Sequence, residues 1–458
     1  MRIIGLLLVI AAFPVFLALL GSPRNRGWAF VALGALPILY APLNFEVSFV
    51  SWPGWPGYIK GLTLSLMDPL ALAICLRCGR GRRASPMLWV FAIYLACMVP
   101  GMLAGLFMPA FFFVFQIMRI MLFFHAVYLA VMNGQMMRMA QGLAIAVIVS
   151  AIVSVNEAIS GATQAMGILG HQNLTGLAVN LCVPLLLSLG IRTNRILFFV
   201  AVAAAAVVAV TGGSRATMAF FGLVVAGTLV ATLLVKPTGR SLAVTGLAVV
   251  GLVAAFPFAM GKLDQRGVEV FGVDLERVAF ERAAKLMAED HPWGAGINQF
   301  VTVANTSGYY ARGGVRWGMS ARGTNVHNVY WLIRAEAGAI GLFGLLVWLS
   351  VPIISALSML FRKRLVLREV GAASGIAIIG AALHSQYEWI FVTAAPQYLV
   401  ALMIGVIAAA RAYTVPAGKT PRGESLIGGA EGSEAQPSVR EPGRPPLEGL
   451  ARSSNGTR

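Results

Sequence analysis

Long apolar stretches follow one another along most of the chain, and short polar segments separate them. Many of these stretches approach or reach the about 17–25 residues that a helix needs to cross the hydrocarbon core of a membrane. They cover residues 3–20, 28–44, 62–76, 86–107, 109–132, 142–159, 172–190, 196–212, 216–235, 241–260, 329–350, 370–387 and 390–410. Because prolines interrupt some of them, we expect 12 or 13 crossings. The pattern predicts an all-α polytopic membrane protein.

Composition supports this prediction, because 58% of the 458 residues are hydrophobic and only 12% are charged. A soluble domain carries about 25% charged residues. The net charge is +17, and basic clusters fall at every second connection. These clusters are Arg77 with Arg80, Arg82 and Arg83; Arg138; Arg192 with Arg195; Lys236 with Arg240; and Arg362, Lys363, Arg364 and Arg368. Lys and Arg accumulate on the cytoplasmic side of membrane helices, so the charge indicates orientation and argues against nucleic acid binding.

The longest polar interruption covers residues 261–328, and the alternation of basic loops places it outside the cell membrane. Within it, residues 274–290 carry apolar side chains at spacings of three and four, which predicts a helix. The helix should end at His291, because a residue before a proline is disfavoured in the α conformation. We therefore expect a partly helical periplasmic loop whose helix lies along the membrane surface.

Residues 415–458 form a second region, rich in Gly, Pro, Ser, Glu and Arg. Such a composition is too poor in apolar residues to fold, so we expect a disordered cytoplasmic tail after a transmembrane domain of residues 1–414. The four cysteines lie in or beside apolar runs, and Cys75 and Cys78 form a pair without a second pair. Because a structural zinc site needs four ligands, buried free thiols are expected.

Three basic residues on the expected outer side are candidates for chemistry. Ser214 and Arg215 begin a helix, where unpaired backbone N–H groups favour an anion, although an arginine can also simply extend its charge towards water there. Arg277 projects from the loop helix and is equally well explained as a surface charge paired with Glu281. His327 stands where the chain re-enters the membrane, and a histidine side chain there suits proton transfer or phosphate binding.

Ionisable residues inside the apolar runs form a second group of candidates. Glu336 lies one or two turns deeper than His327, near Arg334, and charges at such depth are functional or paired with each other. Glu388 stands near the outer rim, where an acid could act as a base. Arg119, His125 and His384 are explained equally well as polar contacts between helices, and His171 and Asn173 begin another helix on the outer side.

Together Arg215, Arg277, His327 and Glu388 suit an anionic, diphosphate-bearing substrate whose lipid part stays in the bilayer. Guanidinium groups bind phosphate oxygens in pairs and keep their charge. The loop has no Asp-x-Asp pair to hold a divalent metal, so neither a metal nor a cofactor is expected, and arginines must neutralise the leaving diphosphate.

The same residues carry a resemblance to the superfamily of O-antigen ligases and Wzy-type polysaccharide polymerases, which are polytopic bacterial glycosyltransferases. The matching elements are Ser214-Arg215; Arg277 in a helix followed by residues 292–296 (PWGAG); residues 326–330 (VHNVY); and residues 336–341 (EAGAIG). The match covers roughly residues 170–410, and Glu281 departs from it, because an aromatic residue is common after the loop arginine.

The resemblance implies a metal-independent enzyme of the inner membrane with a periplasmic active site. It would take a glycan from undecaprenyl diphosphate and transfer it to the lipid A-core, as ligases do, or to another lipid-linked glycan, as polymerases do. By the same resemblance, Arg215 and Arg277 would bind the diphosphate, and His327 would contact the phosphate or activate the acceptor hydroxyl. From its position at the outer rim, Glu388 is a second catalytic candidate, and Ser214, Asn328 and Glu336 are the expected supporting residues.

Partners would be the donor, the acceptor, membrane lipids and, for a polymerase, a chain-length regulator. We expect ligase-like transfer. An O-antigen or exopolysaccharide polymerase is the alternative. A lipid-linked anion transporter is a hypothesis of another class, against which the absence of an internal sequence repeat argues.

Overall fold

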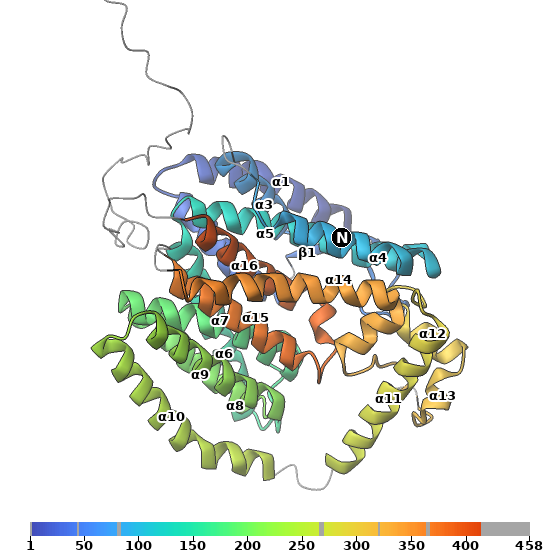
Figure 1. Ribbon diagram of the computed structural model, residues 1–458. Coiled ribbons are helices and arrows are strands. Elements are labelled where there is room, and N and C mark those ends of the chain that lie inside the picture. The colour runs from blue at the N-terminus through green and yellow to red at the C-terminus, as the bar shows by residue number, and fades with distance from the viewer. Residues whose placement is uncertain are drawn as a thin grey trace, which may run out of the picture.

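The computed structural model describes residues 2–43, 45–79, 84–264, 270–318, 321–362 and 367–413 (Figure 1). The tail predicted from residue 415 onwards lies outside the described residues. The first half of the described chain contains α1 Arg2–Gly21, α2 Arg26–Leu39, β1 Glu46–Ser51, β2 Gly61–Ser65, α3 Met67–Cys78, α4 Leu88–Ala104, α5 Phe107–Met132, α6 Met136–Ile159, α7 Gln172–Thr193 and α8 Ile196–Thr211. The second half contains α9 Arg215–Val235, α10 Gly239–Asp264, α11 Val270–Asp290, α12 Phe300–Thr306, α13 Tyr309–Gly313, α14 Val329–Met359, α15 Arg368–His384, the short 3-10 helix η1 Ile390–Val392 and α16 Ala394–Ala412.

Among the described residues, seven helices are long and apolar enough to cross a membrane: α1, α5, α6, α7, α9, α14 and α16. The helices α2, α4 and α8 and the first half of α10 are also apolar but shorter, with 10–17 residues each. Large apolar side chains remain exposed on the long helices, such as Ile152 on α6 and Leu234 on α9, as lipid-facing surfaces require. The chain is thus a helical multi-pass membrane protein, as predicted, while the count of 12 or 13 crossings stays a prediction.

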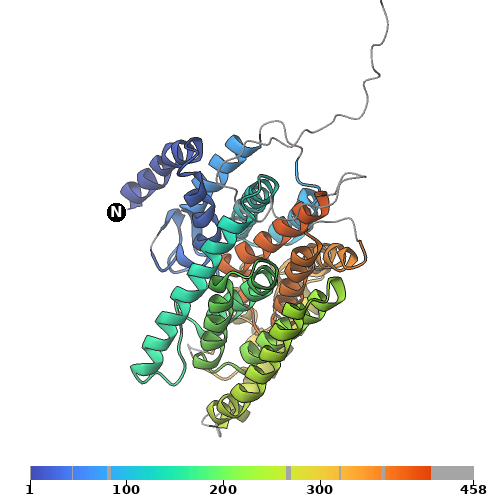
Figure 2. The ribbon, with the colours of Figure 1, turned by 90° about the vertical axis from the view of Figure 1, so that its left-hand side faces the viewer.

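The helices lie side by side, with α1 at one edge of the bundle and α10 at the opposite edge (Figures 1 and 2). The apolar stretches of α7 and α16 are 94% and 89% buried, so these two helices form the centre of the bundle. Helices α11, α12 and α13 lie together at one end, which we call the loop end (Figure 1). The opposite end, which we call the basic end, carries Arg26, Arg77 and Arg192 beside helix termini.

The first turn of α1 lies at the loop end. A Cβ built on Gly5 would contact Val47 of β1 at 3.3 Å, and the turn after β1 is bound to the loop, because Trp55 Nε1 donates to the carbonyl oxygen of Asn298 at 2.9 Å. The helix α1 therefore begins at the end of the bundle that carries α11.

The beginning of α1 and the polar loop thus lie at the same end of the bundle.

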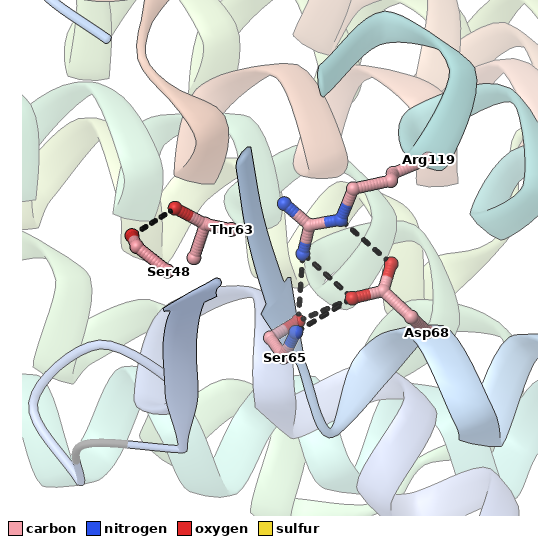
Figure 3. Close-up of polar contacts among 5 residues, drawn as sticks. All are labelled: Ser48, Thr63, Ser65, Asp68 and Arg119. Carbon is pink, nitrogen blue, oxygen red and sulfur yellow. Dashed lines mark hydrogen bonds and ion pairs between the residues drawn. The ribbon is translucent and has the colours of Figure 1, made fainter. Parts of the chain in front are cut away.

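The expectation that residues 62–76 form one helical span is wrong in its first part, and the fold is not purely α-helical. β1 pairs antiparallel with β2, and Glu46 lies opposite Ser65. Residues 61–65 alternate small or polar with apolar side chains, a period of two that suits a strand, and the helix α3 begins only at Met67. Ser48 Oγ and Thr63 Oγ1, 2.7 Å apart, join the two strands across one face (Figure 3).

A buried ion pair fixes this hairpin to the bundle (Figure 3). Arg119 of α5 donates from Nε and Nη2 to the two carboxylate oxygens of Asp68 at 2.9 and 2.7 Å, and Nη2 also donates to Ser65 Oγ at 3.0 Å. A buried charge is tolerated where a partner and hydrogen bonds compensate for the lost water. Arg119 is therefore a contact between elements, one of the two explanations that the sequence allowed.

Helix α14 is broken at Gly338, whose backbone has φ +72° and ψ −171°. This conformation is essentially restricted to glycine. The break leaves backbone groups without partners inside the helix, and the segment that follows α11 supplies them. Ala295 N donates to Ala335 O at 2.9 Å, Gly296 N donates to Glu336 O at 3.0 Å, and Ala339 N donates to Pro292 O at 3.3 Å.

The buried carboxylate of Glu336 joins the same segment to the bundle a second time. It accepts hydrogen bonds from the backbone N–H groups of Asn298, Gln299 and Phe300 at 2.8–2.9 Å, just where α12 begins. Tyr58, in the turn between β1 and β2, donates its hydroxyl to Glu336 Oε2 at 2.6 Å. Glu336 thus stabilises the start of a helix and does not pair with Arg334.

We expect Gly338→Ala to destabilise the protein. A Cβ at this position would lie 2.5 Å from the carbonyl carbon of Trp293, and the backbone conformation would be strained by about 1–3 kcal/mol. The midpoint of thermal unfolding in detergent should fall by several degrees. Gly222→Ala is the matched control, because it lies in α9 with open space around it and alanine favours a helix. Equal midpoints for both variants would contradict the importance of the break.

Candidate active site at the loop end

Four segments that are distant in sequence meet at the carboxylate of Glu388. His327 Nδ1 lies 3.2 Å from Glu388 Oε2, and Arg277 Nη2 donates to Glu388 Oε1 at 3.1 Å. Asn173 Nδ2 donates to the same Oε1. Only 3% of the Glu388 side chain is exposed, whereas 25% of His327 and 35% of Arg277 are exposed. The two basic side chains therefore reach solvent, and the acid that holds them does not.

The charges around Glu388 decide its protonation. Burial raises its pKa, but the hydrogen bond and charge of His327, with the charges of Arg277 and His384, outweigh burial and bring the pKa below its ordinary value. An ionised carboxylate only accepts hydrogen bonds, so His327 must donate from Nδ1. In the neutral ring, Nε2 then carries the lone pair. The arrangement provides a histidine whose tautomer is fixed by a buried acid.

The helices position these side chains. Arg277 lies in α11, and residues 292–296, which bind the broken part of α14, follow this helix. His327 lies two residues before α14, and this turn is bound to the end of α15, since Val329 N donates to Ser385 O at 2.9 Å and Tyr330 Oη donates to Ala382 O at 2.7 Å. Glu388 therefore follows α15 directly opposite His327.

Two further histidines and two aromatic rings border this cluster. His171 precedes α7 and interacts electrostatically with both Glu388 and His327. His384 is fully buried, stacks on Phe220 at 5.2 Å between ring centroids, and interacts with Glu388 and Arg277. The ring of Phe280, one turn after Arg277, lies edge-on to His327 at 6.0 Å. These rings restrict the orientations that the polar side chains can adopt.

Arg215 lies at the same end of the bundle but on another helix. It is the exposed first residue of α9, whose Phe220 stacks on His384. Ser214 caps this helix, because its side chain accepts a hydrogen bond from Thr217 N at 3.3 Å. Asn180 of α7 donates to Thr217 O at 3.0 Å, so the first turn of α9 packs against the helix that carries Asn173.

The three residues expected to support the site have structural contacts. Asn328 caps α14 and accepts hydrogen bonds from Tyr330 N and Trp331 N at 3.0 and 3.3 Å. Ser214 caps α9, and Glu336 binds the start of α12 as described above. Asn328 and Ser214 thus fix the helices that begin beside His327 and Arg215.

The sequence offered little evidence for the role of Asn173. The sequence places Asn173 at the beginning of a helix on the outer side, but nothing in the local pattern indicates its contact with Glu388, 215 positions away. The pairing of Arg277 with Glu281 is also absent, because Glu281 pairs with Lys285 at 2.8 Å and Arg277 pairs with Glu388. All four cysteines are free, as predicted, but the expectation that they are buried holds only for Cys182, since the other three are partly exposed.

No protein-family model matches the chain, and a search of curated proteins finds no match either.

We expect Glu388→Gln to lower stability at neutral pH and to flatten its dependence on acid. Because the folded pKa lies below the ordinary value of about 4.3, ionised Glu388 contributes stability above pH 4.3, and this contribution is lost as the pH falls through the folded pKa. Unfolding midpoints of wild type and variant should therefore converge as the pH falls below the ordinary pKa of a glutamate, about 4.3. Glu289→Gln, an exposed change of the same charge on α11, is the control. A constant difference between Glu388→Gln and wild type across this range would contradict the assignment.

Proposed function

We propose that the chain is a membrane glycosyltransferase that moves a glycan from undecaprenyl diphosphate to an acceptor hydroxyl, most closely like an O-antigen ligase. The observation that carries the proposal is the meeting of Arg277, His327 and Glu388 at one end of the bundle. Arg277 and His327 lie in motifs that carry the resemblance, and Glu388 was predicted from its position near the outer rim.

His327 is the proposed general base. Its Nε2 takes the proton of the acceptor hydroxyl while the hydroxyl oxygen forms a bond to the anomeric carbon of the donor glycan. Glu388 is a positioning residue in this step, because it is buried and contacts His327 on the opposite nitrogen. It orients the ring and stabilises the positive charge that the ring acquires. The sequence also allowed Glu388 to be the base, but only 3% of its side chain is exposed, whereas 25% of His327 is exposed.

The bond between the anomeric carbon and the diphosphate oxygen breaks in the same step, and the leaving undecaprenyl diphosphate keeps the electron pair. Arg277 and Arg215 are the proposed partners of its phosphate oxygens. One nitrogen of Arg277 binds Glu388, so its remaining N–H groups are the ones available to phosphate. The proposed step uses arginine charges where other glycosyltransferases use a divalent cation.

The basic end supports the proposed orientation of the protein. Arg26, Arg77, Arg138, Arg192 and Arg195 lie beside helix termini there, and such clusters mark the cytoplasmic side of a bacterial inner membrane. Under this orientation the site at the loop end faces the periplasm. The glycan donor would then present its diphosphate at the outer membrane–water boundary while its lipid stays in the bilayer.

We expect His327→Ala to reduce glycan transfer by at least about 10²-fold, the usual contribution of a general base, without loss of folded protein from the membrane. Arg277→Lys should also impair transfer strongly, because it keeps the charge but loses the planar fork. Arg282→Lys is the matched control, since Arg282 is exposed on the same helix. Transfer by purified protein from an undecaprenyl-diphosphate-linked glycan is the measurement, and full activity of His327→Ala would remove this residue from the site.

The acceptor is identified in a deletion strain by its lipid A-core and polysaccharide profile. Unmodified core together with full-length polymer left on the lipid carrier would indicate a ligase. Core that bears a single repeat, or loss of a secreted polymer, would indicate a polymerase. Movement of the lipid-linked glycan across liposomes without a new glycosidic bond would replace both with a transporter.

A further inference from the structure

Three helix termini and one turn meet at the basic end and line a pocket of about 400 Å³. They are the end of α1, the start of α2, the end of α3 and the turn between α5 and α6. The polar lining consists of Arg26, Arg77, Asn133 and Gln135, and Leu20 and Phe30 contribute apolar side chains. Because transmembrane helices end at the boundary between hydrocarbon and water, this pocket lies at the depth of lipid headgroups.

The charge of the pocket is positive and has no internal compensation. Neither Arg26 nor Arg77 has an ion pair or hydrogen bond with a described residue, and its lining contains no acid. The adjoining sequence segments 21–27, 77–83 and 133–138 contain seven arginines and no Asp or Glu. This contrasts with Arg119 and Arg277, each of which has a carboxylate partner. The pocket is therefore suited to an anion that the protein does not itself supply.

A second pocket of about 570 Å³ begins at the same arginine. It is lined by Arg77 together with Leu17, Cys75, Leu76 and Gly79 of α1, α3 and the residue that follows α3. Apart from Arg77, its side chains are apolar or weakly polar. Arg77 thus separates a polar pocket at headgroup depth from an apolar groove between two helices. A molecule with a phosphate and an acyl chain would fit both at once.

We propose that this pair of pockets binds an anionic glycerophospholipid. Arg26 and Arg77 bind the oxygens of its phosphate, Asn133 and Gln135 lie within reach of the rest of the headgroup, and one acyl chain follows the groove along Leu17 and Leu76. The site lies at the end of the bundle opposite Glu388, so it is separate from the proposed glycan transfer and does not depend on it. Its lipid would join α1 and α3 to α5 on the basic side.

The test is native mass spectrometry of the purified full-length protein, titrated separately with phosphatidylglycerol and phosphatidylcholine in detergent. We expect retention of phosphatidylglycerol in preference to phosphatidylcholine. The double variant Arg26→Gln, Arg77→Gln should weaken phosphatidylglycerol binding by about tenfold or more, because each arginine near an anionic headgroup contributes substantially to its attraction. The matched control is Arg195→Gln, Lys236→Gln, which removes the same charge from exposed residues outside the lining and its adjoining segments.

Gly21→Leu provides a second variant that keeps both charges. A Cβ on Gly21 would lie 3.6 Å from Arg77 Nη2, and Gly21 is exposed at the end of α1, so a leucine should obstruct the pocket without unfolding the helix. Loss of phosphatidylglycerol in this variant and in the arginine variant, but not in the control, supports the proposal. Equal loss in the control, or unchanged binding in both variants, overturns it. Displacement of the lipid by inorganic phosphate alone would show a soluble phosphate site instead and would also overturn it.

Discussion

The break in α14 at Gly338 is the constraint on which the rest of the loop end depends. A bilayer offers no water to backbone groups, so a helix interrupted at membrane depth must find other partners for them. Residues 292–296 supply these partners, and Glu336 binds the backbone of the next three residues to the same helix. The polar loop is thereby fixed to the bundle at its middle. Because α11 leads directly into this segment, the position of Arg277 follows from the repair of the helix.

Two buried acids illustrate how the surroundings of a carboxylate determine its use. Glu336 accepts hydrogen bonds from backbone N–H groups and one tyrosine, and none of its partners reaches solvent with a charge. Glu388 is buried to nearly the same extent, yet two of the side chains from which it accepts hydrogen bonds are basic and partly exposed. The first arrangement holds the fold together. The second presents a fixed histidine and a fixed arginine to whatever binds at the loop end.

Much of the fold could be predicted because its signals are local. Apolar runs of membrane length indicated the helices, and the three-and-four spacing in residues 274–290 indicated most of α11. The hairpin was not predicted, because the five residues of β2 are followed almost directly by the apolar start of α3. The hydropathy pattern therefore indicated a single apolar stretch. His327, Arg277 and Glu388 were chosen for their chemistry and their expected side of the membrane. Their contacts with one another and with Asn173 could not be predicted, because they join residues 61 to 215 positions apart.

The place of Glu388 between the last two helices has a consequence for the making of the protein. Asn173, Arg277 and His327 leave the ribosome well before the acid that gathers them, and that acid reaches the outer rim only once α15 and α16 have entered the membrane. A chain that is still being synthesised therefore has its basic side chains in place but lacks the residue that orders them. The order of the sequence therefore delays the assembly of this cluster until the last two α-helices of the described chain have been made.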